Sequence, residues 1–507
     1  MRLSEFAANV SAVSLRGDRD PDLTSVAYDS RSVAPGSIFV AVSGFKTDGH
    51  DYLTEALDAG AAAFALEADR EAKWFPLVRG RNVPALVVPD TRAALAQIAA
   101  ALNGKPAQRL RTIGVTGTDG KTSLTHLLHH LLSTTGEKAG LISTAECRIG
   151  DELLPDTGRF TTPEAPEVQK MLSQMVGAGC RYAVIEATSH GLALHRVDEC
   201  EFDIAVFTNL YPDHLDFHGT LEGYIAAKGR LFSMLDDAAQ KGFDKAAILN
   251  ADDPVSEQFS ARTSARVVRY GLRSEADVTA RGITAEGWGT RFRLHGFGEE
   301  RDARVTVPGE FNVYTALAAF SVAHTAGLDG AGAIAAIEKW RGAPGRMQLV
   351  DAGQPFTVLV DFAHAPESLR RALGLMRERT NGRLIAAFGC IGERDKGRRY
   401  SMGQVTAECA DYTIVTDDNP YSEDRDEIIA EIARGLRDAG KREGHDFALI
   451  PDRRDAIAQA LAMAVDGDAV LLAGKGHERE VHLRFSTYPC HDPSVALEVL
   501  RDLGYSR

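Results

Sequence analysis

The chain has 507 residues, of which 44% are hydrophobic, and its formal net charge is -14 at pH 7. This length can bury a large interior and favours about two to four domains, while the acidic balance argues against a dedicated binder of nucleic acid. No apolar run reaches the roughly 20 residues that cross a bilayer, and the start lacks a signal-peptide core. Six scattered cysteines without a C-x-x-C pair indicate neither a disulfide framework nor a zinc site. We therefore expect a soluble, cytoplasmic protein.

The first region predicts a small α/β domain, residues 1–91. A strand is expected at 37–42, followed by a polar loop at 44–50 and a helix-like stretch at 51–67. A further helix is expected at 91–103. Polar loops of this kind are most often solvated turns, so the residues alone leave the role of this loop open.

A glycine-rich loop between an apolar strand and a helix is the strongest signal in the chain. β-branched residues lead into Gly117-Thr118-Asp119-Gly120-Lys121-Thr122-Ser123, and a helix-forming stretch follows. In such a loop backbone N–H groups close on phosphate oxygens, Lys121 reaches the terminal phosphates, and Thr122 offers a hydroxyl to Mg²⁺. Val115 stands where the common G-x-x-x-x-G-K-[ST] spacing has glycine. We predict that the loop binds a nucleoside triphosphate, and a glycine turn with a chance lysine is the alternative.

Residues 92–343 predict a central domain built around this loop. Apolar strands alternate with helical stretches and are expected at 139–143, 182–187, 204–208 and 246–250, with more strands between 266 and 307. This rhythm indicates a mostly parallel sheet with covering helices, like that of P-loop ATPases. Ligands of such sheets collect beyond the carboxyl ends of the strands, where the polar motifs fall.

Several polar residues in this domain are candidates for chemistry. Glu186 ends an apolar strand, and a buried carboxylate there needs a cation such as Mg²⁺. Ser189 and His190 are adjacent at a strand end and therefore point apart, which disfavours a serine hydrolase. Residues 213–218 hold two histidines and two aspartates but no H-E-x-x-H helix, which disfavours a metallohydrolase. Lys228, considered alone, would be an ordinary helix lysine.

Residues 344–507 predict a second doubly wound unit. Five apolar strands are expected at 356–361, 384–388, 412–416, 447–450 and 469–472. The alternation of strands and helices is Rossmann-like, but no G-x-G-x-x-G fingerprint occurs, so a dehydrogenase is disfavoured. Gly474-Lys475-Gly476 could suggest a second phosphate loop, but no Ser or Thr follows the lysine.

Motifs in all three regions resemble those of the Mur ligases, ATP-dependent enzymes that add amino acids to the peptidoglycan precursor. The phosphate loop resembles T-G-T-x-G-K-[TS], with Asp119 where asparagine is usual, and residues 29–36 resemble the D-S-R-x-V-x-P-G unit of MurE-type ligases. The resemblance implies ATP and Mg²⁺ as cofactors. It also implies an N-terminal domain that holds the UDP part of the substrate through Ser30 and the loop from Lys46 to His50, and a C-terminal amino-acid-binding domain.

The resemblance assigns further roles in the central domain. Segments like E-x-[ST]-S-H-G-L, N-L-x-x-D-H-L-D-x-H and A-K-x-x-L-F imply that the metal is held by Thr122, Glu186, His214 and Lys228 as its carbamate. Uptake of CO₂ by an unprotonated lysine makes chemical sense because it turns a cation into an anion that can bind Mg²⁺. The sugar-peptide substrate would be bound by Thr161, Thr162, Thr188, Ser189 and Arg196. The implied catalytic residues are Lys121, Lys228, His214 and Arg346.

Further contacts with ATP are implied for Asn312, Arg346, Asp361 and His364. The incoming amino acid would be bound by Arg394, Asp418, Asn419, Tyr421, Gly474 and Glu478. MurE-type enzymes that use meso-diaminopimelate typically show D-N-P-R, and here Tyr421 stands at the arginine position. A phenol cannot neutralise the second carboxylate, which favours lysine or ornithine, although an arginine from another loop could reach the same place.

The matched motifs run from Asp29 to Glu478, nearly the whole chain. The resemblance implies a monomeric MurE-type ligase that adds a diamino acid to UDP-N-acetylmuramoyl-L-alanyl-D-glutamate through an acyl phosphate. Folylpolyglutamate synthase shares this architecture and chemistry and is one alternative. A nucleotide-binding regulator without catalysis is another.

Overall fold

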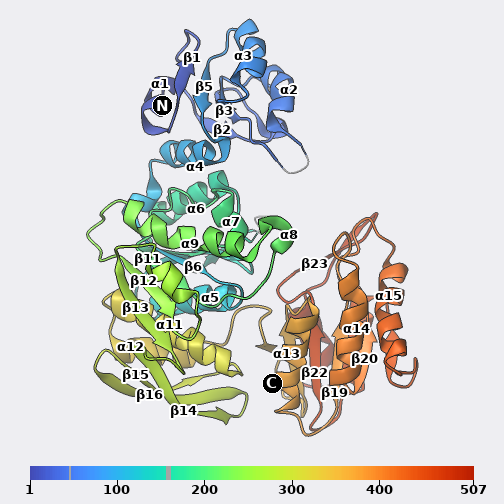
Figure 1. Cartoon of the computed structure of the whole chain (residues 1–507). Helices are drawn as coiled ribbons and strands as arrows, with labels where there is room; N and C mark the ends of the chain where they lie inside the picture. The colour runs from blue at the N-terminus through green and yellow to red at the C-terminus, as the bar shows by residue number, and fades with distance from the viewer. Residues whose placement is uncertain (45–46, 156–160, 507) are drawn as a thin grey trace. The chain divides into compact units, whose positions relative to one another are not determined.

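The computed structural model describes residues 1–44, 47–155 and 161–506. The chain forms two compact units: the first holds Met1–Arg281, Leu294–Arg301 and Tyr314–Ala336, and the second holds Gly282–Arg293, Asp302–Val313 and Ile337–Arg507. Figure 1 shows that each unit is built from sheets covered by helices, so the predicted α/β class is confirmed. Among the described residues, no helix combines the length and the apolar character needed to cross a membrane.

A five-stranded sheet forms the N-terminal part of the first unit. Its order is β1-β5-β4-β3-β2, with β1 (Ser14–Arg16), β2 (Ser25–Ala27), β3 (Ser37–Val40), β4 (Ala63–Glu67) and β5 (Ala85–Val88). Only β1 runs antiparallel to its neighbour. The helical elements are α1 (Leu3–Asn9), η1 (Ser30–Ser32), η2 (Gly49–Tyr52), α2 (Leu53–Asp58), α3 (Glu71–Gly80) and α4 (Thr91–Leu102).

One sequence expectation in this part is wrong. The helix-like stretch at 51–67 is helical only as far as Asp58, and its second half forms β4. Gly60 has a φ of +92°, which turns the chain after α2. Alanine and leucine favour a helix, but β4 lies between β3 and β5 with Ala63 to Leu66 fully buried. Packing on both faces of a central strand outweighs local propensity here. The predicted strand at 37–42 and the predicted helix at 91–103 are confirmed.

The central sheet carries the phosphate loop. Its parallel strands are β12 (Ala246–Asn250), β11 (Ile204–Phe207), β6 (Arg111–Thr116), β10 (Tyr182–Glu186) and β7 (Ala139–Ile142), in that order. Beyond β12 come β13 (Arg266–Gly271), β14 (Val278–Glu286), β15 (Gly289–Gly296) and β16 (Glu299–Val305), and beyond β7 come β8 (Cys147–Ile149) and β9 (Glu152–Leu153). The predicted strands and their parallel arrangement are confirmed. Because β6 lies between β10 and β11, the loops that follow these three strands meet at one edge.

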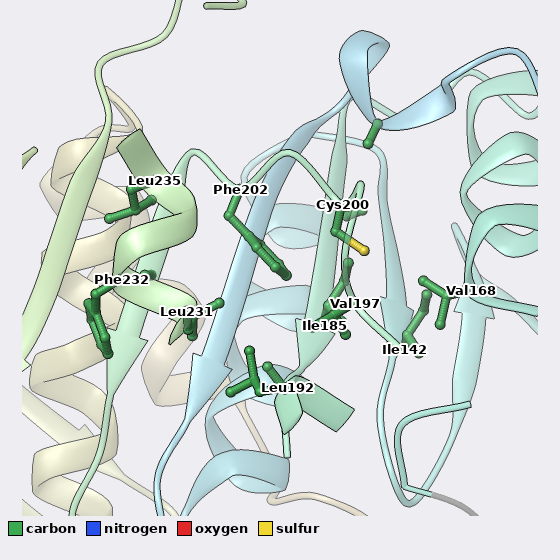
Figure 2. Close-up of a cluster of buried hydrophobic side chains, with 14 of the residues drawn as sticks. Ile142, Val168, Ile185, Leu192, Val197, Cys200, Phe202, Leu231, Phe232 and Leu235 are labelled. Carbon is green, nitrogen blue, oxygen red and sulfur yellow. The ribbon is translucent and has the colours of Figure 1, made fainter. Parts of the chain in front are cut away.

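The helical elements around this sheet are η3 (Pro106–Arg109), α5 (Lys121–Thr134), α6 (Ala165–Gly177), α7 (Ser189–Ala193), α8 (Leu215–His218), α9 (Leu221–Asp237), α10 (Ser256–Ser260), α11 (Glu310–Thr325) and α12 (Gly330–Lys339). Figure 2 shows the core between β7, β10, α6, α7 and α9, where the labelled side chains are 0% exposed: Ile142, Val168, Ile185, Leu192, Val197, Cys200, Phe202, Leu231, Phe232 and Leu235.

The close approach of α9 to β6 positions part of the site. A Cβ atom at Gly114 would lie 2.7 Å from Leu231 and 2.8 Å from Phe202, so both side chains rest on the bare backbone of β6. Each fully buried side chain of this size contributes about 1.5–3 kcal/mol. The helix that carries Lys228 is therefore fixed against the strand that leads into the phosphate loop.

A six-stranded sheet forms the core of the second unit. The order is β17-β18-β22-β19-β20-β21, with β17 (Gln348–Leu349) antiparallel and β18 (Thr357–Asp361), β22 (Ala469–Ala473), β19 (Leu384–Phe388), β20 (Tyr412–Val415) and β21 (Phe447–Leu449) parallel. The covering helices are α13 (Pro366–Arg377), α14 (Gly397–Cys409), α15 (Arg425–Asp438), α16 (Arg453–Ala462) and α17 (Asp492–Asp502). A hairpin of β23 (Glu480–His482) and β24 (Thr487–Pro489) follows β22. The doubly wound prediction is confirmed.

Candidate active site

The phosphate loop joins β6 to α5, as the sequence predicts, and two of its glycines are required by geometry. Gly117 has a φ of +148°, and a Cβ atom there would lie 1.8 Å from the hydroxyl oxygen of Thr208. Gly120 has a φ of +83° and stands immediately before the first turn of α5. The loop thus leads directly into the N-terminus of α5, where unsatisfied N–H groups favour negative charge.

The end of β11 holds this loop in place. Thr118 donates its backbone N–H to the carbonyl oxygen of Asn209 at 2.8 Å, and Asp119 donates its N–H to the Asn209 side chain at 2.9 Å. The Thr208 hydroxyl donates to the carbonyl oxygen of Asp119 at 2.6 Å. The sequence did not predict Thr208 and Asn209 as partners of the loop, because their distance from it along the chain gives no indication of the contact.

Lys228 is not an ordinary helix lysine. It is 1% exposed, and its Nζ atom donates to the carbonyl oxygen of Gly117 at 2.5 Å and lies 4.5 Å from the centre of the Tyr224 ring. Lys121 donates to the carbonyl oxygen of Thr118 at 2.7 Å. Burial, helped by the positive charge of Lys121, lowers the pKa of Lys228 well below its usual value. Burial thus disfavours the charged form of this amine.

Glu186 and Thr122 bring oxygen atoms together beside the loop. The Thr122 hydroxyl donates to both carboxylate oxygens of Glu186 at 3.1 Å, and Glu186 also accepts from the Ser143 hydroxyl at 2.5 Å. Hard oxygen ligands of this kind suit Mg²⁺. In the described part of the chain, no three His, Cys, Asp or Glu side chains are arranged to hold a metal ion. A divalent cation here would therefore need ligands of another kind, such as phosphate oxygens or a modified Lys228.

Three histidines gather near Lys228 and Tyr224. The ring of His190 lies 4.9 Å from that of His214 and 5.5 Å from that of His218. Burial and the two neighbouring histidines lower the pKa of His190 to about 4, and burial also lowers the pKa of His214. A neutral imidazole can act as a metal ligand. Ser189 and His190 begin α7, which corrects the expectation that both lie on a strand end.

The expected substrate residues of the central domain form one cluster. The Thr162 hydroxyl lies 3.0 Å from that of Thr188, and Arg196 donates to the carbonyl oxygen of Thr162 at 3.2 Å. Arg196 also pairs with Glu164 at 2.6 Å. Ser189 is buried at the start of α7, and Thr161 is half-buried beside Thr162 in the chain.

The residues of the N-terminal domain that are expected to bind the UDP part of the substrate differ in how accessible they are. Ser30 is half-buried and opens η1. His50 is 0% exposed and its ring contacts Asp48 at 2.7 Å and accepts from the Glu67 N–H at 3.3 Å. The His50 ring therefore supports the loop from inside and is not available to a ligand. Lys46 lies outside the described residues.

In the second unit, three of the residues expected near ATP lie around β18: Arg346, Asp361 and His364. Asp361 accepts from the Met347 N–H at 2.8 Å, and the Arg346 guanidinium lies 4.5 Å from the centre of the Phe362 ring. His364 contacts the carbonyl oxygen of Phe362 at 2.8 Å. Asn312 lies at the start of α11, where its amide donates to the carbonyl oxygen of Pro308 at 2.6 Å.

The residues expected to bind the amino acid follow β20 and β22. Lys475, which is 0% exposed, donates to Glu478 at 2.7 Å and to Asn419 at 3.1 Å, and lies 3.9 Å from Asp418. Gly474 has a φ of +105°, and a Cβ atom there would lie 3.0 Å from the Asp418 carboxylate. Two carboxyl groups thus surround one buried ammonium group. Sequence reasoning considered Lys475 only as part of a second phosphate loop and missed this contact.

The other two residues expected to bind the amino acid, Tyr421 and Arg394, are more exposed than Lys475. Tyr421 has a φ of +52° and stacks on His482 of β23, with ring centres 5.6 Å apart. Arg394 is exposed in the loop after β19.

Comparison with known proteins identifies this arrangement. Models of the Mur ligase family, catalytic domain, of the Mur ligase middle domain, and of the Mur ligase, glutamate ligase domain match residues 22–102, 115–323 and 345–476. A UDP-N-acetylmuramyl-tripeptide synthetase from Roseiflexus sp. (strain RS-1) is 45% identical and covers 100% of both chains. The chain belongs to the Mur ligase family.

Other Mur ligases agree in sequence and fold. A UDP-N-acetylmuramoyl-L-alanyl-D-glutamate--2,6-diaminopimelate ligase from Bacillus licheniformis is 40% identical over 99% of this chain and 100% of its own. A solved structure of a ligase with the same name has a TM-score of 0.65 and 30% identity, and covers 96% of both chains. This Mur ligase is therefore an ATP-dependent, ADP-forming ligase of peptidoglycan synthesis.

Proposed function

We propose that this Mur ligase adds the third amino acid, a diamino acid, to UDP-N-acetylmuramoyl-L-alanyl-D-glutamate. The names of relatives that match over the full length support this step. The observation that carries the proposal is the group around Lys475, where the Glu478 carboxylate contacts Lys475 at 2.7 Å, is 30% exposed and can also accept from the second ammonium group of a diamino acid. We also propose the domain limits 1–91 for UDP-substrate binding, 92–343 for ATP and 344–507 for the amino acid.

The reaction that this site suits proceeds in two steps. The γ-phosphoryl group passes from ATP to the carboxylate of the substrate, which forms an acyl phosphate and leaves ADP. The amine of the amino acid then attacks the acyl carbon, phosphate leaves, and the amine loses a proton as the amide forms. Residues 117–123 hold the phosphates, with Lys121 neutralising charge that develops on them, and Arg346 adds a second positive charge. Closure around both substrates would exclude water from the acyl phosphate.

Magnesium fits the donors beside the phosphate loop. Thr122, Glu186 and His214 would hold it together with the carbamate of Lys228, and bound Mg²⁺ would neutralise phosphate charge. For the carbamate, the neutral amine of Lys228 attacks CO₂, forms an N–C bond and loses a proton. The buried surroundings and the lowered pKa of Lys228 support this modification.

We assign the substrate's sugar-peptide part to the Thr162 cluster and its uridine end to the N-terminal sheet. Thr161, Thr162, Thr188, Ser189 and Arg196 provide hydroxyl and guanidinium donors in one place. Ser30 and the loop from Lys46 to His50 are the candidates for the uridine end, although the ring of His50 is enclosed. Asn312, Asp361 and His364 are proposed contacts for the nucleotide.

For the amino acid we propose lysine or ornithine rather than meso-diaminopimelate. Tyr421 can donate one hydrogen bond but cannot neutralise the second carboxylate that only meso-diaminopimelate carries. Arg394 is the proposed partner of the α-carboxylate. Relatives named for 2,6-diaminopimelate make that amino acid the competing candidate.

Amino-acid-dependent release of phosphate tests these proposals together. The protein is given ATP, Mg²⁺ and UDP-N-acetylmuramoyl-L-alanyl-D-glutamate, and lysine, ornithine and meso-diaminopimelate are supplied in turn. A clear preference for diaminopimelate would end the lysine or ornithine proposal. Folate-dependent hydrolysis of ATP would favour folylpolyglutamate synthase, and the absence of any amino-acid-dependent turnover would favour a non-catalytic regulator.

A further inference from the structure

Two loops at the carboxyl edge of the second unit are joined along their backbones. The loop after β19 carries Arg394, and the loop after β20 carries Asn419. Gly392 donates its N–H to the carbonyl oxygen of Asn419 at 2.8 Å. A Cβ atom at Gly392 would lie 2.0 Å from the carbonyl oxygen of Pro420, so only glycine permits this approach. The position of one loop is therefore tied to that of the other.

Glu393 makes the second connection between these loops. Its carboxylate accepts from the Ser422 hydroxyl at 2.6 Å and from the Ser422 N–H at 3.2 Å. Glu393 has a φ of +57° and Tyr421 a φ of +52°, a conformation that costs a non-glycine residue about 1–3 kcal/mol. Such a conformation persists only where the surroundings impose it. Since Arg394 follows Glu393 directly, the direction of its side chain depends on this contact.

Glu423 makes the third connection between the two loops and also links them to α14 and α15. It accepts from the Glu393 N–H at 2.5 Å and from the Arg399 guanidinium at 2.9 and 3.0 Å. The Arg399 side chain is 1% exposed and also donates to Glu431 of α15 at 2.9 Å. Arg399 lies in α14, so Glu423 connects the loop of Arg394 to two packed helices.

We propose that Glu423 is a positioning residue for amino-acid binding. By holding the Glu393 N–H and Arg399 at once, it fixes the Arg394 loop relative to Asn419, so that Arg394 meets the substrate carboxylate without reorganisation. This inference rests on the proposed function of Arg394 and goes beyond it, because Glu423 itself need not touch the amino acid.

The test compares Glu423→Ala with Glu431→Ala. Both variants remove one carboxylate from Arg399, but only Glu423 reaches the Arg394 loop. Loss of a hydrogen bond to a charged group costs about 1.5–3 kcal/mol, or roughly 10–100-fold. We expect Glu423→Ala to raise the KM for the amino acid about tenfold or more, with the KM for ATP and kcat within about twofold. Glu431→Ala should leave all three nearly unchanged.

Two milder variants keep the test decisive if Glu423→Ala folds poorly. Glu423→Gln retains an acceptor for the Glu393 N–H and should restore part of the lost affinity. Ser422→Ala removes only the hydroxyl that donates to the Glu393 carboxylate, and the loss of about 1 kcal/mol at this exposed position corresponds to roughly a fivefold rise in the amino-acid KM. An unchanged KM in both Glu423→Ala and Ser422→Ala, or an equal rise in Glu423→Ala and Glu431→Ala, would overturn the proposal.

Hydrogen exchange separates this inference from the proposed function. The exchange of the Glu393 amide, followed without substrates, should accelerate in Glu423→Ala and not in Glu431→Ala. Unchanged exchange in Glu423→Ala would show that the connection does not hold the loop and would overturn the inference. If the wild-type protein shows no amino-acid-dependent turnover, the proposed function fails, while the exchange measurement still decides whether Glu423 holds the loop.

Discussion

Lys121 and Lys228 donate to the same acceptor, the carbonyl oxygen of Gly117, with Nζ to oxygen distances of 3.1 and 2.5 Å. The two residues come from α5 and α9, and only Lys228 is fully enclosed. Burial and the nearby charge of Lys121 both lower the pKa of Lys228. The roles that we propose for the two residues therefore differ: Lys121 binds phosphate, and the enclosed Lys228 is the site of modification.

Replacing Lys121 with alanine should impair the binding of phosphate. We expect Lys121→Ala to lower kcat at least about 100-fold, because the charge that develops on the transferred phosphoryl group loses the positive charge of Lys121. Phosphate release in the presence of all three substrates measures this, and circular dichroism checks that the fold is intact. Substantial ligation by a folded Lys121→Ala protein would contradict the role in phosphate binding.

Lys228 should make the activity depend on carbon dioxide. In buffer depleted of CO₂ the wild-type rate should fall, and added bicarbonate should restore it, because the carbamate reverts to the amine. Intact-protein mass spectrometry under gentle conditions should detect the added carboxyl group. Lys228→Ala should have little activity and no response to bicarbonate. A wild-type rate that is indifferent to CO₂ would count against the carbamate.

The strands and the phosphate loop could be predicted because their signals are local. β-branched runs mark β6, β10 and β11, and Gly117 and Gly120 mark the turn that follows. The segment that forms β4 shows the limit of this reasoning. Its alanines favour a helix, and only the neighbouring strands β3 and β5 make it extended.

Within the candidate site, predictions from the sequence depend on how far apart the partners are in the chain. Thr122 and the loop glycines are neighbours, so their joint role can be predicted from spacing. The burial of Lys228 depends on the packing of α9 against Gly114, and the position of Glu393 depends on Glu423. Contacts of this kind arise from the tertiary fold and leave no periodic pattern in the sequence.

Gly117→Ala should weaken nucleotide binding by more than its loss of folding stability can explain. The new methyl group would lie 1.8 Å from the Thr208 hydroxyl, so the loop must shift. Gly136→Ala is a matched control, because Gly136 has a φ of +90° but a methyl group there would meet no described atom within 4 Å. Gly136→Ala should cost about 1–2 kcal/mol of stability through strain, and Gly117→Ala should cost more because of the clash with Thr208. Only Gly117→Ala should raise the KM for ATP, by about tenfold or more; equal kinetics in both variants would contradict this role of the loop.

Glu423 should give the protein an acid-sensitive source of stability. Hydrogen bonding from Arg399 lowers the pKa of Glu423 from 4.5 to about 2. A carboxyl group with a depressed folded-state pKa stabilises the protein fully above its unfolded pKa and loses this effect as the pH falls towards its folded pKa. The difference in unfolding free energy between wild type and Glu423→Gln should therefore shrink between pH 4.5 and about 2. Urea unfolding at several pH values measures it, and a constant difference would contradict the shift.

Tyr421 should control which diamino acid is accepted. Tyr421→Arg would place a guanidinium where a second carboxylate can pair with it, and a charged hydrogen bond of about 1.5–3 kcal/mol corresponds to roughly a 10–100-fold change. We expect the ratio of kcat/KM for diaminopimelate to that for lysine to rise by this amount. Tyr421→Phe, which keeps a ring for stacking on His482, should leave the ratio within about threefold because the phenol contributes at most one neutral hydrogen bond. An unchanged ratio in Tyr421→Arg would show that selection between the amino acids depends on other residues of the pocket.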